Sequence, residues 1–130
     1  MPSSGTATAD VRARTREDML WAVQRIKQFG EHEGVTLRAS DDPGFPPLVR
    51  DPWLAEQALA ALRRHGAAAL EERAGGVSDG SWASFLGIPT VDGLGPIGDD
   101  DHTEREWIDL PSVAPRVAAV ADLCVAVAAR

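Results

Sequence analysis

The spacing of apolar residues divides the chain into short helices and strands. After Thr15, a favourable N-cap residue, apolar side chains recur at three- and four-residue steps up to Phe29. This spacing predicts a helix with one buried face. Residues 9–14 alternate in polarity and residues 35–39 resemble a second strand. The first forty residues therefore predict a strand, a helix and a strand.

A proline-rich break follows at residues 41–47, which read Asp-Asp-Pro-Gly-Phe-Pro-Pro. Prolines and a glycine concentrated in so short a stretch interrupt both helices and strands. We therefore expect two parts, residues 1–40 and residues 48–130, with residues 41–47 as the linker between them.

Residues 48–130 predict three helices separated by two strands. The expected elements are a helix over 51–66, a strand over 67–73, a helix from Ser78 or Asp79 to Leu86, a strand over 88–94 and a helix after Trp107-Ile108 that contains Pro111 and Pro115. The apolar stripe of the first helix consists of Trp53, Leu54, Ala58, Leu59 and Leu62. The last helix is apolar on nearly all sides, so we expect it to be buried on more than one face. The order helix–strand–helix–strand–helix is typical of an α/β fold with the sheet inside.

Composition and charge exclude several classes of protein. The chain has 130 residues, with 13 basic against 20 acidic side chains, and its net charge of −7 has the wrong sign for a nucleic-acid binder. The single Cys124 excludes an internal disulfide and fits a reducing compartment. The longest apolar run, residues 117–129, is interrupted by Asp122 and is too short to span a bilayer, and we see no secretory leader. We expect a cytoplasmic protein that binds neither nucleic acid nor a membrane.

Candidate chemistry concentrates between Gly75 and Glu106, where two glycine-rich loops flank a short helix. His102 lies in the second loop among carboxylates, and it could be a metal ligand or a solvated loop histidine. A zinc site needs at least three protein ligands, so one histidine is not a site by itself. The run Asp99-Asp100-Asp101 lacks the spacing of a calcium loop. His32 and His65 fall at predicted helix ends, where a cation suits the helix dipole.

A second candidate is the stretch from Gly76 to Gly80, which matches the G-x-S-x-G pattern of a serine nucleophile. Asp92 and His102 follow in the order that such hydrolases require. The residues before this stretch are not a buried apolar strand, however, and the pattern favours Ser78 as the cap of the next helix over Ser78 as a nucleophile. A serine hydrolase using Ser78, Asp92 and His102 stays open as an alternative.

These stretches together resemble the C-terminal end of a known family, the zinc-dependent metallopeptidases and amidohydrolases that include glutamate carboxypeptidase, aminoacylase and succinyl-diaminopimelate desuccinylase. The resemblance covers nearly the whole chain. It is carried by Ala9-Asp10-Val11-Arg12, Gly75-Gly76-Val77-Ser78-Asp79, Leu86-Gly87-Ile88-Pro89-Thr90, Asp92-Gly93-Leu94-Gly95 and His102-Thr103 with Glu106.

The resemblance implies a catalytic domain interrupted by a lid, or dimerisation, domain. Residues 1–40 would then be part of the lid, and residues 48–130 the C-terminal part of the catalytic domain. His102 matches the last metal-binding residue of a site that holds two zinc ions, and Gly75, Gly76 and Ser78 match the loop near the substrate. The substrate would be a peptide or an N-acyl amino acid.

The chain departs from the family because the other metal ligands and the general-base glutamate belong to an N-terminal half that we do not find here. The segment around Pro43 also lacks an arginine that some carboxypeptidase-type members use. We therefore expect a fragment, from a truncated gene or a misplaced start codon, with at most a partial zinc site and no activity alone. The alternative is a non-catalytic module that forms a homodimer through the lid remnant or complements a separate N-terminal half.

Overall fold

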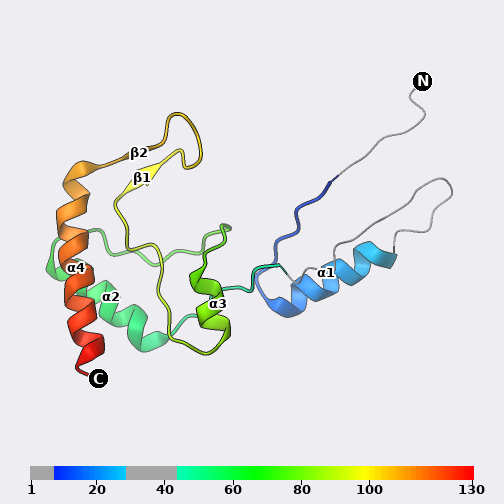
Figure 1. Cartoon of the computed structure of the whole chain (residues 1–130), viewed down its shortest axis with the longest axis horizontal. Helices are drawn as coiled ribbons and strands as arrows, with labels where there is room; N and C mark the ends of the chain where they lie inside the picture. The colour runs from blue at the N-terminus through cyan, green and yellow to red at the C-terminus, as the bar shows by residue number, and fades with distance from the viewer. Residues whose placement is uncertain (1–7, 29–43) are drawn as a thin grey trace. The chain divides into compact units, whose positions relative to one another are not determined.

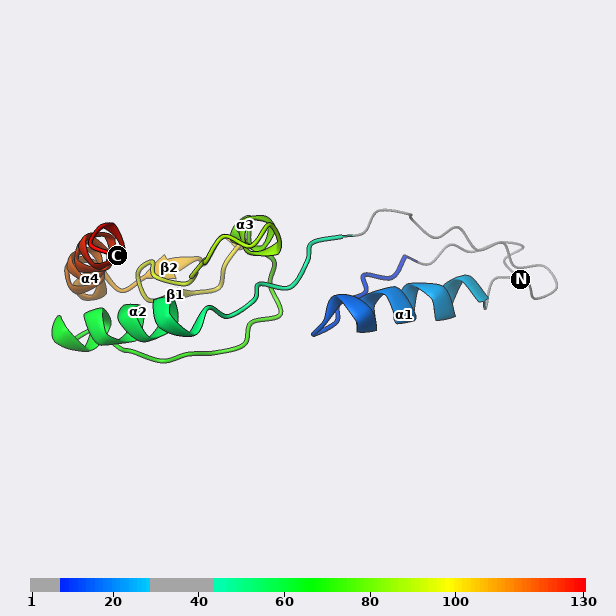
Figure 2. The same cartoon turned by 90° about the horizontal axis from the view of Figure 1, so that it is seen from below.

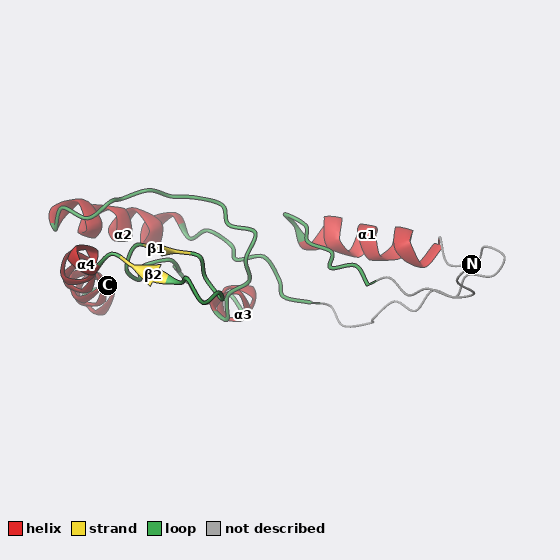
Figure 3. Ribbon diagram, turned by 90° about the horizontal axis from the view of Figure 1, so that it is seen from above, coloured by secondary structure: helices red, strands yellow, loops and turns green. Residues whose placement is uncertain are grey.

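The computed structural model describes residues 8–28 and 44–130, which belong to two compact units, Met1–Pro47 and Leu48–Arg130. The described part of the first unit contains one helix, α1 (Arg16–Gln28). The second unit contains α2 (Pro52–Arg64), α3 (Gly80–Phe85), α4 (Leu110–Ala128) and a two-stranded antiparallel sheet of β1 (Gly98–Asp99) and β2 (Trp107–Ile108). Helices and long loops dominate the described residues (Figure 3).

Helix α1 begins where the sequence predicts. The Thr15 hydroxyl accepts a hydrogen bond from the Asp18 amide at 3.0 Å, so it satisfies one of the free N–H groups of the first turn. The strand predicted over residues 9–14 is wrong, because this segment is irregular in the structure. It contains an ion pair between Arg12 and Asp10 at 2.9 Å, two positions apart in the chain. A strand needs a partner, and its expected partner, residues 35–39, lies outside the described residues.

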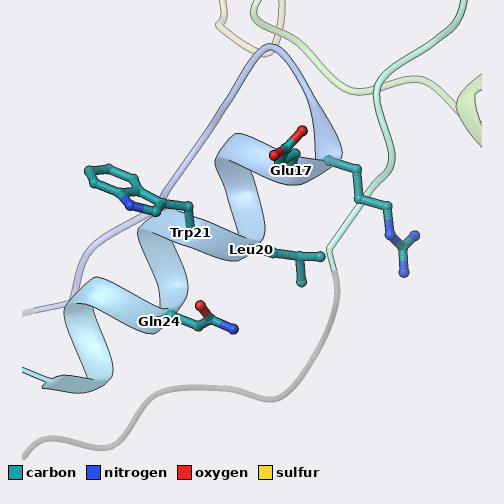
Figure 4. Close-up of a pocket in the computed structure, with 5 residues that line it drawn as sticks. Glu17, Leu20, Trp21 and Gln24 are labelled. Carbon is teal, nitrogen blue, oxygen red and sulfur yellow. The ribbon is translucent and has the colours of Figure 1, made fainter.

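Two large apolar side chains of α1 are open to solvent. Leu20 is 48% exposed and Trp21 63% exposed. Both project from the helix beside Glu17 and Gln24 around a surface hollow lined by α1 residues alone (Figure 4). Helix α1 has no buried residue.

Helix α2 is capped at both ends as its sequence predicts. The Asp51 carboxylate accepts from the Leu54 amide at 2.8 Å, and Pro52 occupies the first turn, where a missing N–H costs little. His65 is the C-cap, and Gly66 follows with a φ of +69°, a backbone conformation that favours glycine.

The core of the second unit lies between α2 and α4, which pack side by side (Figure 1). Its buried apolar residues come from these two helices: Leu54, Ala58, Ala61, Leu62, Ala119 and Leu123. Partly buried side chains complete it, Trp53 from α2 and Ala67, Ala69, Val91 and Leu94 from the connecting segments. Alanines at the contact allow the two helices to approach closely.

An ionic cluster at the end of α2 joins it to α4. The Asp122 carboxylate of α4 interacts with Nη1 of Arg64 at 2.5 Å and with Nε2 of His65 at 2.9 Å. Both partners lower the pKa of Asp122, His65 more than Arg64. The sequence placed His65 at the helix end but did not indicate this contact with α4.

The strands predicted over residues 67–73 and 88–94 are wrong. Both segments are irregular in the structure, although Ala67, Val91 and Leu94 still direct apolar side chains toward the core. A β-strand requires a neighbour for its ladder of hydrogen bonds, and the described residues offer these segments none. The α/β arrangement with an internal sheet is therefore not present in the described residues, which form a helix-dominated unit with a short antiparallel hairpin.

Helix α4 is buried along one side only, so the expectation of burial on several faces is wrong. Its buried residues are Ala119 and Leu123, whereas Leu110, Val117 and Val125 are largely exposed. By length and composition alone α4 could cross a membrane, a test that core helices of soluble proteins also pass. Its Arg116 and Asp122 are both bonded to other segments of the unit.

Helix α3 is held against the segment that leads into α2. The Ser84 hydroxyl accepts from the Val49 amide at 2.9 Å and donates to the Val49 carbonyl at 3.3 Å. Ser81 is buried, and a Cβ on Gly80 would lie 3.0 Å from the Thr90 methyl group. These contacts hold α3, which follows the first glycine-rich loop. Figure 2 shows the position of α3 in the second unit.

Candidate functional site

The candidate site is the loop that joins β1 to β2 and carries His102. The two strands pair in antiparallel register, with Gly98 opposite Ile108 and Asp99 opposite Trp107. A Cβ on Gly98 would lie 2.3 Å from the Trp107 carbonyl oxygen, so only glycine fits this pairing. The sequence did not predict this hairpin, because each strand has only two residues.

Hydrogen bonds within the loop centre on Thr103. Its hydroxyl donates to the Asp100 carbonyl at 2.8 Å and accepts from the Arg105 amide at 3.1 Å. Its amide also donates to the Asp100 carbonyl at 3.2 Å, and its carbonyl accepts from the Glu106 amide at the same distance. The loop therefore has a defined shape although its residues are exposed.

His102 adopts an unusual backbone conformation in this loop. Its φ is +65°, and that of Asp100 is +59°, a region that residues with a side chain rarely occupy. Each such residue costs on the order of 1–2 kcal/mol. The His102 amide donates to Oε2 of Glu106 at 3.4 Å. Strained residues of this kind cluster at functional sites, which makes His102 a candidate worth testing.

A complete metal site is not assembled within the described residues. Nowhere in residues 8–28 and 44–130 do three or more histidine, cysteine, aspartate or glutamate side chains converge on one point. A zinc ion takes four ligands, with at least three from protein. The exposed imidazole of His102 fits a single zinc ligand, so the remaining ligands would have to come from elsewhere.

The serine-hydrolase residues are not joined to one another by hydrogen bonds in the described chain. The Ser78 hydroxyl accepts from the Gly80 amide at 3.1 Å, at the start of α3. The Asp92 carboxylate accepts from the Gly93 amide at 2.7 Å. Both contacts are local, so the geometry favours Ser78 as the residue that satisfies the first turn of α3.

The first glycine-rich loop is open. Gly75 and Gly76 are exposed, and a Cβ on either would meet no atom within 4 Å. The packing of this unit therefore does not explain two consecutive glycines. Their assignment to a substrate loop stays a prediction.

Sequence reasoning missed the contacts from α4 that support the second loop. The Arg116 guanidinium donates to the Gly93 and Gly95 carbonyls, and the Ser112 hydroxyl accepts from the Ile97 amide at 2.9 Å. One signal was available: Arg116 and Asp122 are the charged residues within an otherwise apolar helix. Charges in such a setting usually have a partner.

Comparison with known proteins places the chain among the metallopeptidases. The model of Peptidase family M20/M25/M40 matches residues 5–126, and the chain belongs to that family. The resemblance stated from the sequence is thereby confirmed.

The chain is also similar to carboxypeptidase G2 of Pseudomonas sp. (strain RS-16), with 27% identity over 125 residues. The aligned region covers 90% of this chain and 30% of that protein, so the chain spans less than a third of the relative's length. No solved structure matches the chain significantly.

Proposed function

We propose that the chain is the C-terminal part of a zinc-dependent hydrolase of peptide or amide bonds, of the carboxypeptidase or N-acyl-amino-acid deacylase type. The observation that carries the proposal is His102, strained and exposed in a hydrogen-bonded loop inside the region that matches the family. Its imidazole would supply one zinc ligand. Gly75, Gly76 and Ser78 would lie near the peptide or N-acyl amino acid substrate.

The residues of this chain account for only part of such a site. Zinc, when bound, polarises a carbonyl group and lowers the pKa of water. His102 would hold one position around the metal, and the loop hydrogen bonds of Thr103 and Glu106 would orient it. The relative extends well beyond the matched region, and we propose that equivalent polypeptide supplies the other ligands and the general base. The isolated chain would then be inactive.

A non-catalytic module is the alternative. The exposed apolar side chains of α1, Leu20 and Trp21, favour a protein partner for the first unit. That partner would be a second copy, forming a homodimer, or a separate N-terminal half. The exposed free Cys124 fits the reducing cytoplasm. A sedimentation experiment that finds only monomer would remove the homodimer.

Zinc binding to the purified chain tests the proposal. We expect calorimetry to detect weak binding that disappears in His102→Ala. The matched control is His65→Ala, because that imidazole already interacts with Asp122 and should not contribute. Tight binding lost in His102→Ala would mean that carboxylates such as Asp100 or Glu106 complete a site of their own. Binding unaffected by His102→Ala would contradict the proposal.

Activity distinguishes the remaining classes. We expect no hydrolysis of an N-acyl amino acid or a dipeptide by the chain alone, with or without zinc. Zinc-dependent turnover would overturn the proposed incompleteness. Turnover without zinc that Ser78→Ala abolishes would instead support the serine hydrolase.

A further inference from the structure

Arg116 of α4 is hydrogen-bonded to the glycine-rich segment that leads into β1. Its Nη1 donates to the Gly95 carbonyl at 2.8 Å and to the Gly93 carbonyl at 3.2 Å. Gly93 has a φ of +75°, so the chain turns sharply where the guanidinium holds it. A charged donor shared by two carbonyls fixes their separation as well as their distance from the helix.

The same side chain is incompletely satisfied. Among the described residues, the buried Nε of Arg116 has no hydrogen-bond partner. A buried donor left without an acceptor costs free energy, and native proteins contain few of them. Against this cost stand the two charged hydrogen bonds that Nη1 of the same side chain makes to the Gly93 and Gly95 carbonyls.

A second contact lies one turn earlier on α4. The Ser112 hydroxyl accepts from the Ile97 amide at 2.9 Å and donates to the Asp109 carbonyl at 2.6 Å. The Ile97 carbonyl accepts from the Asp109 amide at 2.7 Å. Helix α4 therefore holds the chain on both sides of Pro96, immediately before the β1–β2 hairpin.

We propose that Arg116 is a positioning residue for His102. By holding Gly93 and Gly95 against α4, it fixes the base of the hairpin whose loop presents the imidazole. Ser112 provides the second attachment. The proposal rests on the proposed function for the role of His102 as a zinc ligand, but the coupling between Arg116 and the hairpin can be measured without zinc.

The test uses amide hydrogen exchange by NMR on the full chain. Arg116→Met keeps an unbranched stem comparable to the aliphatic part of arginine and removes the guanidinium donors. We expect exchange at the Ile97 and Asp109 amides to accelerate about tenfold, since charged hydrogen bonds are lost. Exchange at Ala119 and Leu123, in the α2–α4 core, should change less than about twofold. The matched control is Arg63→Met on the exposed side of α2, which should leave all four amides unchanged.

Two results would overturn the proposal: unchanged exchange at Ile97 and Asp109, or equal acceleration at all four amides, which would mean that Arg116 only stabilises the unit. If Arg116→Met does not fold, Arg116→Gln decides, because its shorter, uncharged side chain cannot place a charged donor between the Gly93 and Gly95 carbonyls. Accelerated exchange at Ile97 with an intact core is then expected, and wild-type exchange refutes the coupling.

Zinc titration of the same samples separates the two proposals. We expect the zinc-dependent shift of the His102 imidazole resonances to require about tenfold more metal in Arg116→Met than in the wild type. No zinc-dependent shift in the wild type would refute the proposed function, while the exchange rates still decide whether Arg116 positions the hairpin. A shift with the same midpoint in both proteins would refute the positioning of His102.

Discussion

Two neighbouring glycines show how differently one residue type is used in the candidate site. Gly98 lies in β1, where an added Cβ would be 2.3 Å from the backbone oxygen of Trp107. Gly95 lies just before the strand, where an added Cβ would meet nothing within 4 Å and the backbone does not adopt a positive φ. Only Gly98 is therefore required by the packing of the hairpin.

We predict that Gly98→Ala separates β1 from β2, because the methyl group and the Trp107 oxygen cannot both remain in place. The expected loss is about 1–3 kcal/mol of local stability, measured as loss of cross-strand contacts between Gly98 and Ile108 in NMR spectra. Gly95→Ala is the matched control and should keep those contacts. An intact hairpin in Gly98→Ala would contradict the requirement for glycine at this position.

Elements formed by local interactions were predictable from the sequence, and those that need a distant partner were not. Asp51 with Pro52 marked the start of α2, and Thr15 marked the start of α1, because a cap acts within one turn. The predictions of strands at 67–73 and 88–94 were wrong because an apolar sequence pattern does not by itself provide a neighbouring strand to pair with. For the same reason the motif around His102 indicated a candidate ligand, but not the contacts of Arg116 with Gly93 and Gly95, which span 23 and 21 positions of sequence.

The two long helices of the second unit, α2 and α4, each begin with an aspartate N-cap and a proline in the first turn. They differ in whether the aspartate side chain accepts a hydrogen bond from the helix. Asp51 caps α2 through its carboxylate, whereas Asp109 makes no side-chain cap bond to α4. The Asp109 backbone is instead tied to Ile97.

We predict that Asp51→Ala lowers the free energy of unfolding by about 1 kcal/mol, because the Leu54 amide loses its acceptor. Asp109→Ala, the matched control, should change it by no more than about 0.5 kcal/mol. Urea denaturation followed by circular dichroism measures both. Equal losses would mean that the two aspartates stabilise their helices in the same way.

For the second unit as a whole, the contact of Asp122 with Arg64 and His65 connects the α2–α4 packing to pH. The pKa of Asp122 lies below its ordinary value of 3.8, because His65 and then Arg64 favour the charged form. A lowered carboxyl pKa means that the contribution to stability is present above the ordinary value and is lost as pH falls through the pKa of the folded state.

We predict that Asp122→Asn reduces the loss of stability as the pH falls below about 4, because the variant has no carboxylate at position 122 to protonate. Urea unfolding at a series of pH values measures the change against the wild type. Asp79→Asn is the control, because that carboxylate makes no cap bond to α3. If Asp122→Asn shows the wild-type pH dependence, the cluster does not couple the helices.

The attachment of the hairpin to α4 also has a consequence for the order of events during protein synthesis. The ribosome makes a chain from its N-terminus, so His102 is made before Ser112 and Arg116. The nascent chain therefore contains the candidate metal-binding residue His102 before it contains Ser112 and Arg116, which we propose fix its position. Any event that stops synthesis or cleaves the chain ahead of Ser112 would leave the His102 loop without the contacts from α4 to Gly93, Gly95 and Ile97.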